Sequence, residues 1–370
     1  MCRIRVGVLL VVLGMAACSP APPPPEPSRE PIADFLARTL PEGPGGTVIA
    51  AHGERIVHCE GFGMADREAR IAATCDTVYD IMSITKQFTA AAILKLELLG
   101  ELRVTDPIDR YVGPVPADKR GITLHHLLTH TAGLVEGLGD DYEVQSREAM
   151  LAGALASTPL SAPGAEFHYS NMGYSVLAAI VEKVSGLGYE QFLARHLFGP
   201  AGMTSTGYVL PRWERNQVAV EYDAEGESQG RPFEHPWAAD GPHWNLRGNG
   251  GILSTARDMF RWHLALTGDA VLSASARAKL FTPVQVPDSD ESYAYGWSIT
   301  DANDERIAWH DGGNDWSLAV YARSLNDAPA DAVMTFWASN HVNQESDWNL
   351  EDLEPNLTLG ILDRARSQPS

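Results

Sequence analysis

Two residues in the stretch from Tyr79 to Leu99 have the types and spacing needed for nucleophilic chemistry. Ser83 and Lys86 lie three residues apart, and on a helix such residues share one face, one turn apart. A serine hydroxyl is a weak nucleophile until a neighbouring base takes its proton. Lys86 could be that base if burial lowers its pKa from about 10.4 towards neutrality. The pair therefore indicates acyl transfer to a serine.

The element that must position this pair is predicted to be a buried helix. Apolar residues cover most of its circumference: Phe88, Ala91, Ala92, Ile93, Leu94, Leu96, Leu98 and Leu99. A helix that is apolar all round belongs in a core. A single Ser-x-x-Lys match also occurs by chance on solvated helices, but of the five lysines in this chain only Lys86 follows a serine by three residues.

Composition excludes several classes of function. The chain has 370 residues and a net charge of −20. Binding to nucleic acid needs clustered Lys and Arg to neutralise phosphates, and docking on anionic lipid needs basic segments. We therefore expect neither nucleic acid nor a charged membrane surface as a partner.

The N-terminus is typical of an exported protein. Arg3 and Arg5 precede an apolar run, residues 6–17, that is too short to span a bilayer and has the layout of a signal peptide. The run ends in Leu-Gly-Met-Ala-Ala before Cys18 and resembles a bacterial lipoprotein signal, although Met15 stands where leucine is usual. The resemblance predicts a signal peptide over 1–17 and lipidation of Cys18; cleavage without lipidation is the alternative.

The segment that follows is rich in proline and poor in core-forming residues. Residues 18–32 are predicted to form an extended polyproline tether, with a disordered tail as the alternative. Export places Cys59 and Cys75 in an oxidising compartment, where they either pair in a disulfide or stay free. Two cysteines at this spacing do not indicate a metal site.

Strand-like and helix-like segments alternate in blocks along the chain. Residues 46–51 and 55–59 read as a hairpin, and helical spacing dominates the middle. Four further strands are predicted at 294–300, 306–310, 318–324 and 332–338, with a closing helix at 350–366. This order predicts one hydrolase domain over 33–370, with an αβ part from about 33–99 and 290–370 and a helical part at about 100–289.

Three short motifs follow one another along the chain: Ser83-Ile-Thr-Lys86, Tyr169-Ser-Asn171 and His310-Asp-Gly312. Two further motifs lie between them, Leu-Leu-Thr-His-Thr-Ala-Gly at 127–133 and Gly-Gly-Ile-Leu-Ser-Thr at 250–255. The set resembles the serine β-lactamase and penicillin-binding-protein superfamily. It is most similar to the class C-like branch, which includes DD-carboxypeptidases, D-aminopeptidases and esterases. The resemblance implies an α+β fold with an antiparallel sheet flanked by helices and an inserted, mostly helical region.

The resemblance also implies roles for the matched residues. Ser83 forms the acyl-enzyme and Lys86 helps remove its proton. Tyr169 shares this acid and base work, which requires the Lys86 ammonium to stabilise a phenolate. Asn171 holds Lys86 and binds a substrate amide.

The strand from His310 to Gly313 is implied to flank the site. Gly312 permits close approach of the backbone to substrate, and the backbone N–H groups of Ser83 and Gly313 form the oxyanion hole. β-Lactamases usually have lysine where this chain has His310, which weakens a β-lactamase assignment. If His310 touches substrate, activity should change across roughly pH 5.5–7.5.

Other candidate residues are expected to be structural. His125, His126 and His130 lack metal-ligand spacing and are predicted to pack around a helix. His235 and His243 have no acidic partner at metal-ligand spacing and are read as loop residues. Trp237 and Trp244 either line the cleft or pack their loop.

The sequence thus predicts an exported, periplasmic, lipid-anchored serine hydrolase. It acts on a small amide, ester or lactam, as a free molecule or within a peptide, without metal or cofactor. An esterase is the second enzymatic reading, favoured if the loop around Trp237 and Trp244 forms an apolar cleft. The alternative from another class is a non-catalytic lipoprotein that binds a cell-wall peptide or a protein partner. The oligomeric state is left open.

Overall fold

The computed structural model describes residues 29–285, 292–302, 305–325 and 328–368. The predicted signal peptide, Cys18 and most of the predicted tether therefore lie outside the described residues. In the part of the chain that the structure describes, no helix is long and apolar enough to cross a membrane.

An antiparallel sheet of eight strands forms the centre of the fold, in the order β11-β12-β13-β14-β15-β16-β1-β2. The first strand of the chain, β1, pairs with the late strand β16 along its whole length, from Gly46 opposite Ser339 to His52 opposite Val333. The two ends of the sequence therefore meet inside one sheet, and the predicted α+β class is confirmed. The strands are β1 (Gly46–His52), β2 (Arg55–Phe62), β11 (Val284–Gln285), β12 (Ser292–Tyr293), β13 (Ser298–Ala302), β14 (Glu305–Gly313), β15 (Leu318–Ser324) and β16 (Val333–Ser339).

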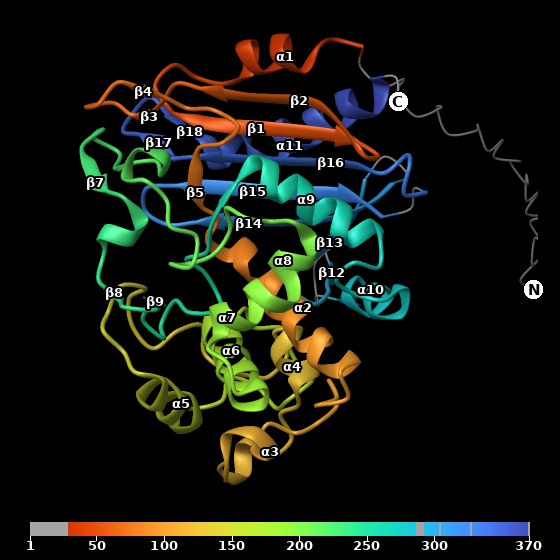
Figure 1. Cartoon of the computed structure of the whole chain (residues 1–370). Helices are drawn as coiled ribbons and strands as arrows, with labels where there is room; N and C mark the ends of the chain where they lie inside the picture. The colour runs from red at the N-terminus through yellow and green to blue at the C-terminus, as the bar shows by residue number, and fades with distance from the viewer. Residues whose placement is uncertain (1–28, 286–291, 303–304, 326–327, 369–370) are drawn as a thin grey trace, which may run out of the picture.

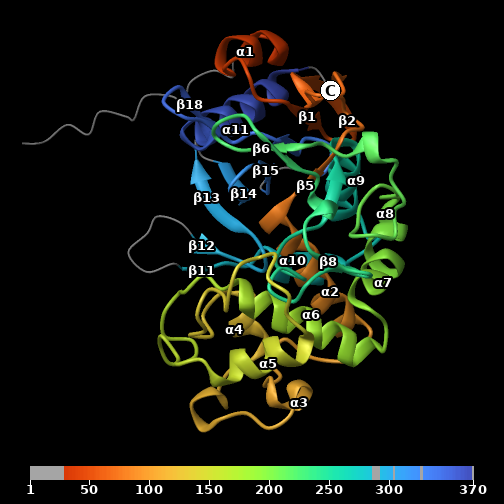
Figure 2. The ribbon, with the colours of Figure 1, turned by 90° about the vertical axis from the view of Figure 1, so that its left-hand side faces the viewer.

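Two helices from the chain ends cover the outer face of the sheet. These are α1 (Ile32–Thr39) and α11 (Leu350–Ser367), which lie together on the side away from the helical region (Figures 1 and 2). Alternate residues of β15, such as Val320 and Ala322, point into this outer core, whereas Ala319 and Tyr321 point into the inner one. This alternation is the two-residue period of a strand buried on both faces.

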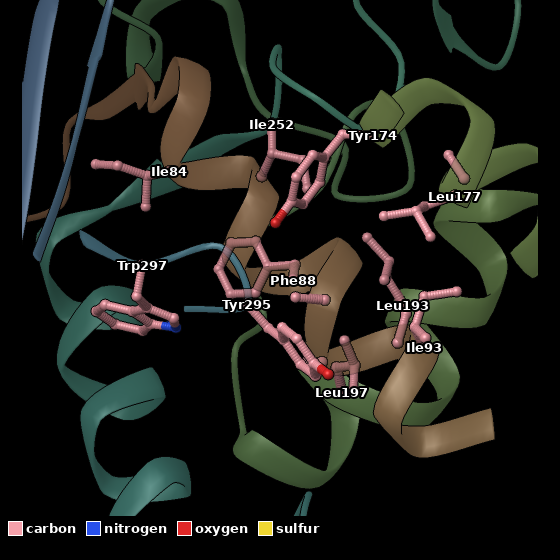
Figure 3. Packing of buried hydrophobic residues seen from close by; sticks show 14 of the residues in the cluster. Ile84, Phe88, Ile93, Tyr174, Leu177, Leu193, Leu197, Ile252, Tyr295 and Trp297 are labelled. Carbon is pink, nitrogen blue, oxygen red and sulfur yellow. The ribbon is translucent and has the colours of Figure 1, made fainter. Parts of the chain in front are cut away.

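The inner face is covered by α2 (Thr85–Leu98) and α9 (Ala256–Thr267), below which the helical region lies (Figure 1). Phe88 of α2 is fully buried, and its ring packs edge-on against Phe198 and Trp262 at centroid distances of 5.0 and 4.9 Å. Figure 3 shows Phe88 among side chains from both parts of the molecule. The other helices are α3 (Asp109–Val112), α4 (Leu124–Leu128), α5 (Arg147–Ala156), α6 (Asn171–Ser185), α7 (Tyr189–Leu193), α8 (Gly199–Ala201) and α10 (Ala274–Leu280).

The predicted limits of the helical part, about 100–289, differ from the structure. Helix α9 packs against β1 and β16 and contributes Met259 and Trp262 to the inner core. It therefore belongs to the sheet layer although its sequence lies within the predicted insertion. Periodicity predicts that a segment is helical, but not which surface its apolar face covers.

Cys59 of β2 and Cys75 are joined by a disulfide with a Cα–Cα distance of 5.9 Å. This settles the alternative that the sequence left open. The bond ties β2 to the segment that leads into β5 (Val78–Asp80), and β5 runs directly into the turn that carries Ser83. The disulfide therefore anchors the approach to the candidate nucleophile.

Candidate active site

Ser83 lies in a tight turn between β5 and α2, in the single 3-10 turn Met82–Ile84. Met82 has a φ of 45°, which a residue with a side chain adopts only when its surroundings hold it there. The carboxylate of Asp80 accepts a hydrogen bond from Met82 N at 2.6 Å, and Ile81 N donates to Ile252 O at 2.9 Å. The turn is thus fixed from both sides and leaves Ser83 partly exposed.

Lys86 is completely buried one turn along, in the first turn of α2. Its Nζ donates to Ser83 Oγ at 2.9 Å and to the carbonyl oxygen of Asn249 at 2.9 Å. Burial lowers the pKa of Lys86 to about 7, while Asp141, Asp311 and other nearby carboxylates partly oppose the shift. A lysine with this pKa is a free amine for much of the time at neutral pH and can accept the serine proton.

Tyr169 completes the predicted catalytic set. The centroid of its ring lies 4.8 Å from Lys86 Nζ. Burial raises the pKa of Tyr169 above its usual value, although the nearby Ser83 side chain acts in the opposite direction. The phenol therefore stays protonated at neutral pH, which does not favour the predicted phenolate and makes Tyr169 better suited to donate or relay a proton.

His130 holds the segment that carries Tyr169. Its carbonyl accepts from His168 N at 2.8 Å, and its Nδ1 accepts from Ser170 N at 3.0 Å. The imidazole also packs against the Tyr169 ring at a centroid distance of 4.4 Å. His130 has a φ of 57°, and in this conformation it accepts hydrogen bonds from the residues on both sides of Tyr169. It packs in the core, as predicted, and it also positions Tyr169.

Strand β14 passes directly against the nucleophile turn. A Cβ atom at Gly312 would lie 2.7 Å from both Ser83 N and Ile81 O, which is closer than real Cβ atoms approach backbone atoms. Glycine at 312 is therefore a packing requirement of the nucleophile turn, and the predicted approach of this strand to substrate stays a prediction. The predicted oxyanion hole from the N–H groups of Ser83 and Gly313 fits this placement and stays a prediction.

Gly312→Ala is expected to lower kcat/KM by roughly 100-fold, because the new methyl group must displace β14 from Ser83 and misalign the oxyanion donors. Gly313→Ala is the matched control, since a Cβ there meets nothing closer than 3.9 Å and the N–H is kept. Steady-state kinetics of the two variants check this. Equal activities would show that the approach at Gly312 is not needed.

His310 departs from the titration behaviour expected of a histidine that touches substrate. It is 3% exposed, and its Nε2 lies 3.0 Å from Tyr293 Oη. Burial lowers the pKa of His310 to about 4, with the Lys86 ammonium acting in the same direction and Asp311 opposing it. The imidazole is therefore neutral over the whole range of roughly pH 5.5–7.5 in which its titration was expected.

Asn171 also departs from its predicted role. It begins α6, but within the described residues Lys86 makes its side-chain hydrogen bonds to Ser83 and Asn249, not to Asn171. Asn171 instead lines a cavity beside the site, where it could still bind a substrate amide. Sequence reasoning missed Asn249, whose main-chain oxygen holds Lys86; its place beside the noted Gly-Gly-Ile-Leu-Ser-Thr motif was the available signal.

The remaining candidates take structural places. His126 caps the start of α4 together with Thr123, and His125 Nδ1 lies 2.8 Å from Tyr295 Oη. His235 lies outside the helices and strands, and its Nε2 lies 3.3 Å from the buried carboxylate of Glu221, a contact that the sequence spacing does not indicate.

Trp237 and Trp244 pack their loop. Trp244 is buried in the inner core, and Trp237 meets Tyr208 edge-on at 6.0 Å. The described residues of the cavity beside the site do not include either tryptophan. The condition that favoured an apolar, esterase-like cleft is therefore not met by this loop.

A serine whose hydroxyl meets a buried lysine of lowered pKa, at the head of a core helix and beside a glycine strand, has the arrangement that a lysine-activated serine nucleophile requires. Comparison with known proteins agrees. The family model described as "Beta-lactamase" matches residues 34–347. A penicillin-binding protein of Bacillus subtilis (strain 168) is 30% identical over 289 residues, which are 72% of this chain and 62% of that relative.

Solved structures give the same result. An octameric penicillin-binding protein homologue from Pyrococcus abyssi superposes with a TM-score of 0.74 at 27% identity, over 89% of this chain and 77% of that one. A penicillin-binding protein from Bacillus halodurans superposes with a TM-score of 0.71 at 25% identity, over 88% of this chain and 99% of that one. The chain belongs to the beta-lactamase family, whose members are serine hydrolases, and it is similar to penicillin-binding proteins within that superfamily.

Proposed function

We propose that this chain is an exported, lipid-anchored serine hydrolase that transfers the acyl group of a small amide, ester or lactam to Ser83 and then to water. One observation carries the proposal. The Lys86 amine, completely buried, lies 2.9 Å from Ser83 Oγ, which is the geometry of a nucleophile and its base.

In the proposed reaction, Ser83 Oγ attacks the substrate carbonyl and its proton passes to Lys86 Nζ. The tetrahedral oxyanion is stabilised by the N–H groups of Ser83 and Gly313. Collapse breaks the bond to the leaving group, which takes its proton through the Tyr169 hydroxyl. Water then attacks the acyl-enzyme, gives up its proton to the same groups, and releases the acid and free Ser83.

Export and anchoring rest on the sequence of residues 1–32. The basic start, the short apolar run and Cys18 support secretion to the periplasm and lipidation. The proline-rich segment would then separate the domain from the membrane surface. The similarity to proteins named as penicillin-binding proteins supports a compact acyl substrate such as a lactam or a peptide.

The test is intact-protein mass after treatment with a serine-reactive fluorophosphonate and, separately, with a penicillin. We expect one fluorophosphonate adduct in the wild type and in the matched control Ser275→Ala, an exposed serine of α10, and none in Ser83→Ala. A stable penicillin adduct would indicate a penicillin-binding protein, a transient one a β-lactamase, and none an esterase or amidase. Folded wild-type protein that forms no adduct with either reagent would overturn the proposal in favour of the non-catalytic binding protein.

A further inference from the structure

A cavity of about 630 Å³ opens beside the candidate active site. Its walls come from four parts of the chain: the loop from Glu136 to Tyr142, Asn171, Asn245, and residues 314–316. Asn171 lies two residues after Tyr169 and begins the helix that follows it. The cavity therefore shares with the proposed catalytic set the segment that carries Tyr169 and Asn171, and it is large enough for part of a small substrate.

The charge of this cavity has one sign. Glu136, Asp140, Asp141 and Asp315 line it, and its described lining contains no lysine, arginine or histidine. Among the salt bridges of the described residues, none involves these four carboxylates. Their charge is thus left for solvent or for a ligand to balance.

The same negative field reaches the nucleophile. Glu136 and Asp141, together with Asp311 of β14, stabilise the charged form of Lys86. Asp311 lies between His310 and Gly312, the residue that touches the Ser83 turn. A substrate carbonyl held at Ser83 therefore lies within the field of at least three carboxylates, and interactions at this range are strong where water is partly excluded.

A second observation points to a ligand with hydrogen-bond donors. The side-chain Oδ1 atom of Asn171 is buried and has no hydrogen-bond partner among the described residues, although Asn171 lines the cavity. A buried acceptor without a partner needs a donor from water or a ligand. In the same wall the rings of Tyr142 and Trp316 stack on each other at 6.0 Å, and each stacks on His235, at 4.3 and 4.7 Å.

The arrangement disfavours two other occupants. Among the described residues no three His, Cys, Asp or Glu side chains come together as a metal ion requires. A carboxylate on the substrate near its scissile bond would meet Asp311 and Asp141 without a basic partner in the described cavity lining, and an unpaired like charge is unfavourable.

We propose that the substrate of this enzyme carries an ammonium group on its acyl portion, bound in the acidic cavity beside Ser83, and lacks a carboxylate next to the scissile bond. This inference rests on the proposed acyl-transfer function and narrows its substrate class. Primary and quaternary ammonium groups share the required charge, and a primary ammonium or a neighbouring amide N–H also supplies the donor for Asn171.

The test uses three p-nitrophenyl esters of similar size that differ in charge. The acyl groups are γ-trimethylammoniobutyryl, its isostere with tert-butyl in place of trimethylammonio, and glutaryl with its free carboxylate. Each kcat/KM is divided by the rate of hydroxide-catalysed hydrolysis, which removes the intrinsic reactivity of the ester. We expect the cationic ester to exceed the neutral one by at least about tenfold, the glutaryl ester to fall below both, and the difference to shrink with added salt.

Asp141→Asn and Asp315→Asn are each expected to lower the ratio of cationic to neutral ester by at least about threefold. Asp34→Asn, an exposed residue of α1 on the far side of the sheet, makes the same change in net charge and should keep the wild-type ratio. Two cavity variants are used so that misfolding of one does not decide the result.

A ratio near one in the wild type, a preference for the glutaryl ester, or a cationic preference that survives in both folded cavity variants would overturn the inference. These results are separable from failure of the proposed function. An enzyme that forms the fluorophosphonate adduct at Ser83 but shows no charge preference loses only the inference, whereas a folded protein that forms no adduct loses both.

Discussion

Lys86→Met is expected to slow acylation of Ser83 by roughly 10³-fold, because a positioned general base contributes about 10²–10⁴-fold. Methionine keeps the length and apolar stem of lysine but cannot accept a proton. The measurement is the rate of fluorophosphonate adduct formation at neutral pH, followed by mass. Lys95→Met is the matched control, since Lys95 lies on the same helix and its Nζ binds Val271 O, away from Ser83.

The same substitution is expected to stabilise the fold. Burial lowers the pKa of Lys86 from 10.5 to about 7, and this gap corresponds to on the order of 5 kcal/mol. The folded pKa is below the unfolded one, so the cost of burying the ammonium is full below about pH 7 and fades as pH rises towards 10.5. The gain in free energy of unfolding should therefore shrink between pH 7 and pH 10 in urea titrations.

For the acylation prediction, a normal acylation rate in folded Lys86→Met would refute Lys86 as the base.

Local sequence could predict the parts of this molecule that depend on short spacing. Ser83 and Lys86 meet because one helical turn separates them, and residues 318–324 form a strand because alternate side chains serve the two cores. The order of the short motifs along the chain indicated the fold, because the motif segments are the ones that contact one another at the candidate active site. The contact of Gly312 with the Ser83 turn does not belong to this class, since it joins segments far apart in the sequence.

Contacts between distant segments could not be predicted from spacing. The carbonyl of Asn249 reaches Lys86 across 163 residues, and a main-chain oxygen leaves no mark in residue type. His235 meets Glu221 only because the loop folds back over β6 (Glu221–Tyr222). The burial of His310 follows from its place on β14 beside Tyr293, and it is this burial that removes the imidazole from the expected titration range.

The pH dependence of kcat/KM distinguishes Lys86 from His310 as the group whose titration controls acylation. With an uncharged ester, we expect kcat/KM to rise about tenfold per pH unit in the acid range and to level off near pH 7, because only the neutral Lys86 amine can accept the serine proton. Burial sets this pKa at about 7, whereas burial of His310 sets its pKa at about 4. His310→Gln should therefore keep the inflection near pH 7.

Asp141→Asn should move that inflection to lower pH. The Asp141 carboxylate stabilises the Lys86 ammonium, so its removal lowers the pKa of the lysine further. The two variants together identify the titrating group. If the inflection moves to lower pH in Asp141→Asn and stays in place in His310→Gln, it belongs to Lys86. An inflection that vanishes in His310→Gln would return the titration to the histidine, and a flat profile between pH 5 and 8 would show that neither group limits acylation.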